Sequence, residues 1–222
     1  MSWQFLRKFN SHTLHLFQKS LGIDPFITHI HPDLSEEAVT LMSESKVDIK
    51  SYELTWSKLG NLIVSIPDIP HIPPDQSKLK LLDEPKDYAK SGTVPKRIDA
   101  TKLDQYHLKS QMLPSIAIAN SKWTNNSGDG ALTPLQAELF SLFNNYQDVY
   151  FPEQSLEVGE EVCFSYCLHI ANHTLKTRSA CVHHNARLSK KEKEIVPDEY
   201  RDQGLVRPKA LIVVPFRESG KR

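Results

Sequence analysis

Six prolines between Ser65 and Pro95 place the strongest constraint on how this chain can fold. Proline cannot donate a backbone hydrogen bond and clashes with the preceding helical turn, so neither a long helix nor a central strand can persist there. A second break follows at residues 120–130, which are polar and include two glycines. The breaks predict three parts: a helical N-terminal segment at 1–64, a proline-rich extended linker at 65–130, and an ordered domain at 131–222.

Composition narrows the class of protein. The 222 residues include 27 basic and 27 acidic side chains, so the global charge gives no reason to expect a polyanionic partner. The charges are unevenly distributed, because residues 173–222 carry 12 Lys or Arg against 6 Asp or Glu. No apolar run approaches the ~18 residues of a membrane span, so we expect no membrane partner. Three cysteines, an odd number without a signal sequence, indicate an intracellular protein.

Two helices are predicted after residue 131. Thr133 and Gln136 form a capping-box pattern with a proline at the first helical position, which predicts a helix from Pro134 to about Gln147. A wide apolar stripe, an acidic first turn and a basic last turn predict a second helix from about Glu160 to Arg178.

Ala210 to Val214 is a short apolar run rich in β-branched residues, which predicts a strand buried in a parallel sheet. A capped helix, a second helix and a buried strand occur in this order at the start of a helicase-type RecA-like domain, so the fold class is α/β. There a glutamine senses adenine and a turn after the strand touches nucleic acid. Gln136 and the turn at 215–218 occupy these two places, although we expect Gln136 to cap its helix.

The nucleotide site of such a domain has no counterpart in the sequence. A phosphate loop needs the pattern G-x-x-x-x-G-K-[ST], in which glycines let backbone amides wrap the phosphates, and the pattern does not occur. Asp83-Glu84 resembles a magnesium-binding Asp-Glu box but precedes Gln136, which is the wrong order. We therefore predict no catalytic residues and no cofactor.

Histidines and cysteines suggest two further kinds of site. His169 and His173 are four residues apart and could chelate zinc, but Ile170 stands where a hydrolytic site needs glutamate. Cys163 and Cys167 lack a second cysteine pair. We expect these side chains to pack in the interior and predict no metal. A small-molecule hydrolase is a third class of function, supported by Cys and His residues alone.

Four stretches closely resemble the digestive organ expansion factor family, also called U3 small nucleolar RNA-associated protein 25. They occur in the family's order: IDPFITHI at 23–30, ALTPLQAELFSLFNNYQDVYFP at 131–152, YCLHIANHTLKTR at 166–178, and RDQGLVRPKALIVVPFRES at 201–219. The resemblance implies the first part of a degenerate DEAD-box-like RecA domain, preceded by a mixed, proline-interrupted N-terminal region. Family proteins are longer, so the chain is expected to be an N-terminal to central fragment.

The resemblance also implies a nuclear, nucleolar component of the small-subunit processome. We expect a non-catalytic protein that binds RNA and protein in ribosome biogenesis, with pre-ribosomal RNA, U3 small nucleolar RNA and other processome proteins as partners. The alternative is an active RNA-dependent ATPase whose phosphate loop is missing from this fragment. By charge and position at element ends, the expected RNA contacts are Lys176, Arg178, Arg187, Arg207, Lys209 and Arg217.

Overall fold

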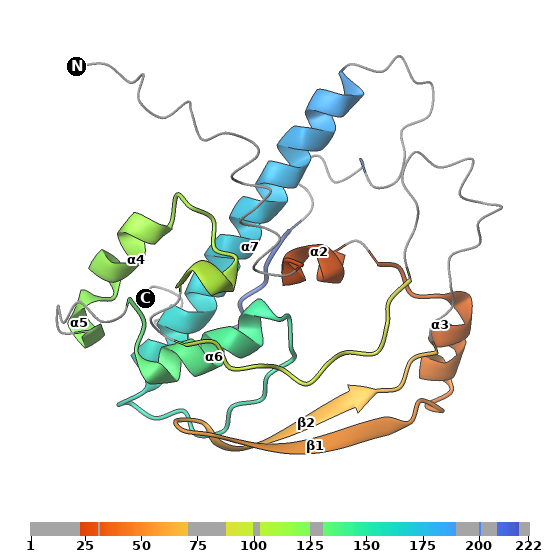
Figure 1. The fold of residues 1–222 in the computed structure, drawn as a ribbon, viewed down its shortest axis with the longest axis horizontal. Coiled ribbons are helices and arrows are strands. Elements are labelled where there is room, and N and C mark those ends of the chain that lie inside the picture. Colours follow the sequence, from red (N-terminus) through yellow and green to blue (C-terminus); the bar gives the residue numbers. More distant parts are fainter. Residues whose placement is uncertain are drawn as a thin grey trace.

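The computed structural model describes residues 23–30, 32–70, 88–99, 103–124, 131–189, 200 and 208–217 (Figure 1). The helices are α2 (Pro25–Ile30), α3 (Glu36–Ser43), the 3-10 helix η2 (Leu103–Tyr106), α4 (Leu113–Ala119), α5 (Ser121–Thr124), α6 (Pro134–Asn144) and α7 (Gly159–Leu188). The strands are β1 (Ile49–Trp56) and β2 (Gly60–Pro67). The fold is mixed α/β, and Figure 1 shows the strand hairpin along one side, with α6 above it and α7 rising away from both.

α6 forms as its capping box predicts. The Thr133 hydroxyl accepts a hydrogen bond from the Gln136 amide at 3.2 Å, and the Gln136 side chain accepts one from the Thr133 amide at 2.9 Å. Both bonds satisfy amides that the first turn of a helix leaves unpaired. α6 ends at Asn144, three residues before the predicted end at Gln147. Its Leu139 and Phe140 are fully buried.

The core lies between α6, α7 and the segment around η2 and α4. Tyr106 of η2 packs against Phe140 with ring centroids 5.1 Å apart, and Ile116 and Leu168 belong to the same cluster. The Tyr106 hydroxyl donates to the carbonyls of Ile98 at 3.0 Å and Ala137 at 3.2 Å. A buried hydroxyl needs such partners, so the tyrosine fixes the position of η2 as well as filling the core.

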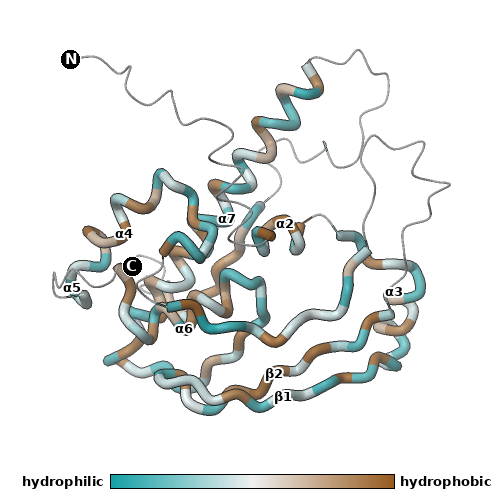
Figure 2. Tube along the Cα trace, viewed as in Figure 1, coloured by the Kyte–Doolittle hydropathy of each residue, from teal (hydrophilic) through white to brown (hydrophobic). Residues whose placement is uncertain are grey.

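β1 and β2 form an antiparallel hairpin whose register runs from Ile49 opposite Pro67 to Trp56 opposite Gly60. Both strands carry apolar residues (Figure 2), and along β2 burial alternates: Leu62, Val64 and Ile66 are at least partly buried, whereas the residues between them are exposed, as expected for a sheet with one solvent-facing side. Gly60, which follows the three-residue loop and starts β2, has φ +68°, a left-handed conformation that glycine adopts at little cost. The hairpin corrects our expectation that residues 1–64 are helical, which overlooked the β-branched and aromatic residues of these two strands.

The hairpin loop is attached to α6 by Glu138, a carboxylate buried in the described structure. Oε1 of Glu138 accepts from the Ser57 hydroxyl at 2.7 Å, and Oε2 accepts from the amides of Lys58 at 2.9 Å and Leu59 at 2.8 Å. Burial alone would raise the pKa of Glu138, but these hydrogen bonds and the nearby Arg97 charge bring the pKa below its usual value. The carboxylate is therefore ionised and holds the loop in place.

The expected extended linker at 65–130 is also only partly extended. β2 continues to Pro67, at the end of a strand, where proline removes few ladder hydrogen bonds. Residues 103–124 form η2, α4 and α5. The six prolines that motivated the prediction lie upstream of these helices, and three of them fall at 71–87, outside the described residues.

α7 begins at Gly159, one residue before the predicted start, but runs ten residues beyond Arg178 to Leu188. Neither proline nor glycine occurs between Arg178 and Leu188, so nothing in the sequence stops the helix at the basic turn that we took for its end. The second half of α7 projects beyond α6 in Figure 1.

The strand predicted at Ala210–Val214 is wrong for this structure. These residues belong to no strand, and Leu211, Ile212 and Val213 are exposed. A strand requires lateral hydrogen bonds, and no described segment pairs with this one. Residues 208–217 instead run beside α7 (Figure 1).

Two of our predictions fall outside the described residues, namely Asp83-Glu84 and the RNA contact at Arg207. Among the residues that are described, no helix is long and apolar enough to cross a membrane.

Candidate functional site

A group of histidine and aromatic side chains lies where α2, the end of α6 and the middle of α7 meet. We call this group the histidine–tyrosine cluster; its members are Phe26, His29, Tyr146, His169 and His173. The ring of His29 stacks on Tyr146 with centroids 4.1 Å apart, and His169 meets the same ring edge-on at 5.0 Å. Phe26 contacts His173 edge-on at 5.7 Å. Tyr146 is therefore the centre on which the helices converge.

Tyr146 follows α6 and has φ +55°, an uncommon conformation for a bulky residue. This conformation places its ring between α2 and α7, and its hydroxyl lies 2.9 Å from Nδ1 of His173. Burial and the Asp24 charge both raise the pKa of Tyr146, so the phenol is neutral. Packing and this hydrogen bond stabilise the unusual backbone conformation.

The histidines of the cluster have lowered pKa values. Burial lowers the pKa of His169 to about 4, with further contributions from the charges of His173, Lys176 and His29. Burial is also the main cause of the lowered pKa values of His173 and His29, although Asp148 partly offsets it at His29. The rings are therefore neutral at pH 7 and can pack together without repulsion.

Lys176 lies one turn beyond His173 on α7 and is buried, with 7% of its side chain exposed. Its ammonium group pairs with both carboxylate oxygens of Asp24, at 2.8 and 2.7 Å, and sits 5.8 Å from the centre of the Phe26 ring. Burial lowers the pKa of Lys176, and Asp24 opposes that shift. We expected Lys176 to contact RNA from the surface. The structure instead places its ammonium group in a buried ion pair with Asp24.

The four stretches that carry the family resemblance meet at this cluster. Asp24 of the first stretch pairs with Lys176 of the third, and Tyr146 of the second bonds to His173 of the third. His173 also forms a hydrogen bond with the backbone of Lys209, in the fourth. Nearby, Asn172 accepts a hydrogen bond from the Lys109 amide at 3.0 Å. The stretches thus describe one structural junction.

The other expected RNA contacts do not form one continuous track on α7. Arg178 and Arg187 are both exposed, but nine residues correspond to about two and a half turns, so they project from opposite sides of the helix. Arg187 donates to the Tyr200 hydroxyl at 3.0 Å. Arg217 is exposed, and Lys209 is half-buried.

Gln136, the residue in the adenine-sensing position, is fully buried and paired with Asn120. Asn120 Nδ2 donates to Gln136 Oε1 at 2.6 Å, and Gln136 Nε2 donates to Asn120 Oδ1 at 2.8 Å. With the Thr133 amide, these bonds occupy both ends of the Gln136 side chain. The capping role that we predicted is confirmed, whereas no pattern in the sequence indicated that Asn120 would pair with Gln136.

All three cysteines lie on α7, Cys163 and Cys167 in its first half and Cys181 in its second. The Tyr166 hydroxyl donates to Cys163 Sγ at 3.1 Å. Cys167 is exposed, which corrects our expectation that it packs in the interior, although partial desolvation and the neighbouring Cys163 raise the pKa of its thiol. A raised pKa disfavours the reactive thiolate. Within the described ranges, no three His, Cys, Asp or Glu side chains group as a metal site would require.

Comparison with known proteins identifies the family. The family model described as "UTP25, NTP hydrolase-like domain" matches residues 146–222. The human protein named U3 small nucleolar RNA-associated protein 25 homolog is 35% identical over 203 residues, or 90% of this chain. The chain belongs to the UTP25 family. The resemblance that we based on four sequence stretches is thus confirmed.

UTP25 relatives extend from vertebrates to fungi. The Xenopus tropicalis homolog is 34% identical over 90% of the chain, and the Schizosaccharomyces pombe protein is 31% identical over 93%. The chain spans about a quarter of the length of these UTP25 proteins, namely 24% of the human, 23% of the frog and 27% of the yeast protein. No solved structure matches the chain.

Proposed function

We propose that this chain is a non-catalytic, RNA- and protein-binding part of a nucleolar small-subunit processome component that acts in U3-dependent processing of pre-ribosomal RNA. The relatives' names, which describe proteins associated with U3 small nucleolar RNA, support this assignment. We also propose that residues 131–222 begin a degenerate DEAD-box-like RecA domain. The "NTP hydrolase-like" family description and the order of α6 and α7 support that fold.

The environment of Gln136 is the observation that carries the non-catalytic part of the proposal. An adenine-reading glutamine must present its amide to the nucleotide edge. Gln136 is instead fully buried, and both polar atoms of its side-chain amide form hydrogen bonds with Asn120 and the Thr133 backbone. Releasing it would leave the buried Oδ1 of Asn120 without its donor, which costs about 1–3 kcal/mol.

The distribution of exposed cations supports RNA binding. Arg178, Arg187 and Arg217 are exposed in the part of the chain with a basic excess. Guanidinium groups make strong bidentate contacts with phosphate, so such side chains suit an RNA backbone.

An active RNA-dependent ATPase is the competing function, favoured by the "NTP hydrolase-like" description of residues 146–222. Titration of the purified chain with Mg-ATP and with single-stranded RNA separates the two. We expect RNA binding that weakens with salt, and no saturable ATP binding tighter than about 100 μM, which corresponds to ~5.5 kcal/mol. Tighter ATP binding that also accelerates ATP hydrolysis on RNA addition would favour the ATPase.

The localisation and partners require a separate measurement. We expect the tagged full-length protein to concentrate in the nucleolus and to co-purify with U3 small nucleolar RNA after ultraviolet crosslinking. A protein that stays outside the nucleolus and recovers no more U3 RNA than an untagged control would contradict the proposal.

A further inference from the structure

The loop between α6 and α7 exposes two large apolar side chains that no described residue covers. Tyr150 is 91% exposed and Leu156 is 99% exposed. The loop is nevertheless anchored at both ends. Tyr146 holds its start in the histidine–tyrosine cluster, and the Ser155 carbonyl accepts the Gly159 amide at 2.9 Å where α7 begins. Both ends of the loop that carries these apolar side chains are therefore held in place.

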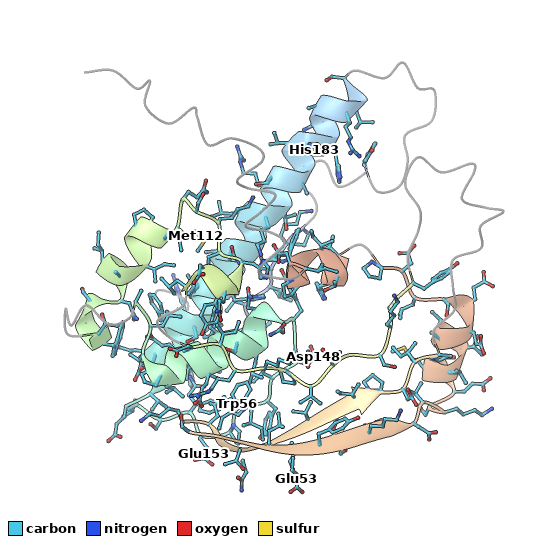
Figure 3. All side chains as sticks on the ribbon, in the orientation of Figure 1. Glu53, Trp56, Met112, Asp148, Glu153 and His183 are labelled. Atoms are coloured by element: carbon cyan, nitrogen blue, oxygen red, sulfur yellow. The ribbon has the colours of Figure 1, made fainter. Side chains whose placement is uncertain are left out.

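The same loop carries negative charge only. Residues 147–158 include Asp148, Glu153 and Glu157 but neither Lys nor Arg. Glu153 and Glu157 are exposed and form no ion pair with another described residue. Figure 3 shows Glu153 pointing away from the body of the protein. This surface would repel RNA phosphates, whereas it would attract a basic protein.

The acidic loop also lies at the opposite end of α7 from Arg187. α7 starts directly after the loop, and its 30 residues span about 45 Å. Arg187 stands in the last turn of the helix, and His183 marks the same end in Figure 3. Exposed charges this far apart are screened from one another at physiological salt, so the two ends can bind different partners.

We propose that residues 147–158 are a docking surface for a protein segment in which apolar side chains are flanked by Lys and Arg. Tyr150 and Leu156 supply the apolar contact, and Glu153 and Glu157 attract the basic flanks. Aromatic side chains are enriched at the centres of protein interfaces, and charges at the rim speed association. This inference specifies the protein-binding part of the proposed function, and it does not depend on RNA binding elsewhere in the chain.

Site-specific photocrosslinking tests the proposal on the full-length protein. The photoreactive amino acid p-benzoylphenylalanine replaces Tyr150 in one version and Ile63 in a control, because Ile63 is also largely exposed, at 76%, but lies on β2. In nuclear extract treated with ribonuclease, we expect a protein adduct at position 150 that is absent at position 63. Peptide mapping should place the crosslink within a segment rich in Lys or Arg.

Substitutions then test each chemical component. We expect Tyr150→Ala with Leu156→Ala to reduce the adduct formed by a crosslinker at Gln154 by about tenfold or more. Glu153→Lys with Glu157→Lys should also reduce it and remove its salt dependence, whereas Glu37→Lys on α3 should not. Salt-dependent RNA binding should persist in all these variants, which separates failure of this inference from failure of the RNA assignment.

The inference would be overturned by no adduct above the Ile63 control, by an adduct to RNA, or by an adduct to an acidic or uncharged segment. A crosslink to another part of the same chain would also overturn it, because Tyr150 would then be covered internally. Circular dichroism of each variant confirms that the fold is retained.

Discussion

Asp24 and Lys176 form a buried ion pair across 152 residues of sequence, with the Lys176 Nζ within 2.8 Å of both carboxylate oxygens. Asp24 also accepts the Phe26 amide at 3.0 Å, at the start of α2. One carboxylate thus begins a short helix and attaches it to α7. Lys176, in the Lys-Thr-Arg sequence that ends the stretch at 166–178, therefore has a structural role.

Breaking this pair should destabilise the fold strongly. Asp24→Asn keeps the size and the hydrogen-bond acceptor but leaves the Lys176 charge uncompensated, and removing one partner of a buried pair costs about 3 kcal/mol. Urea unfolding followed by circular dichroism at pH 7 measures this loss. Adding Lys176→Met should recover much of the lost stability, because this change removes the uncompensated ammonium group.

The exposed pair of Lys46 and Glu44 provides the control, with its atoms 2.6 Å apart. Glu44→Gln should cost less than about 1 kcal/mol, because exposed ion pairs contribute little. Equal losses for Asp24→Asn and Glu44→Gln would contradict the role that we assign to the buried pair.

Glu138 should stabilise the attachment of the hairpin to α6. Glu138→Gln retains the shape but loses the charge that receives three hydrogen bonds, so we expect a loss of about 2 kcal/mol at pH 7. Because the folded-state pKa of Glu138 is lowered, its contribution is present above the unfolded-state pKa and is lost as the pH falls through the folded value.

Chemical unfolding between pH 7 and pH 3 checks both statements. The difference between the wild type and Glu138→Gln should shrink with acid. Glu53→Gln, an exposed change on β1, should leave stability nearly unchanged. A difference for Glu138→Gln that is independent of pH would show that the charge is not responsible.

His169 should make the fold sensitive to mild acid. Its pKa is lowered from 6.5 to about 4, so between these values the unfolded state binds more protons than the folded state. Stability is therefore expected to fall as the pH drops from 6.5 towards 4. His169→Phe keeps an aromatic ring without a titrating group and should flatten that fall in urea unfolding measured at several pH values. His183→Phe, at the exposed end of α7, should retain the wild-type dependence.

The sequence predicts the elements whose signals are local. The capping box at Thr133 and Gln136 sets the start of α6, and the apolar stripe places the first two-thirds of α7. These signals depend on neighbours three or four residues away, so tertiary contacts are not needed to recognise them.

Features that depend on distant contacts were not predictable in this way. The hairpin lacks an Asn-Gly turn, and its loop is held by Glu138, about 80 residues away. Nothing near Lys176 in sequence indicates that Asp24 neutralises it, so a basic helix end suggested a surface cation. The apolar run at 210–214 satisfies the pattern of a strand, but a pattern cannot supply the neighbouring strand that pairing requires.

RNA binding should depend on the cations near the C-terminus and not on Lys176. Each phosphate contact contributes roughly 0.7 to 0.9 to the slope of log affinity against log salt. Changing Arg207, Lys209 and Arg217 together to alanine should therefore flatten the slope by about 2 if all three touch phosphate. Affinity should fall alike for unrelated RNA sequences, because phosphate contacts carry no base information.

Fluorescence anisotropy with two unrelated single-stranded RNAs, at several salt concentrations, measures these slopes. The matched control replaces Lys46, Lys50 and Lys58, which lie on or beside the hairpin, and should leave the slope unchanged. Lys176→Met with Asp24→Asn should also leave it unchanged, because the Lys176 ammonium is buried against Asp24 and is not presented to phosphate. A folded triple variant of Arg207, Lys209 and Arg217 with the wild-type slope would show that these residues make no phosphate contact, and RNA binding would then have to use other cations of the chain.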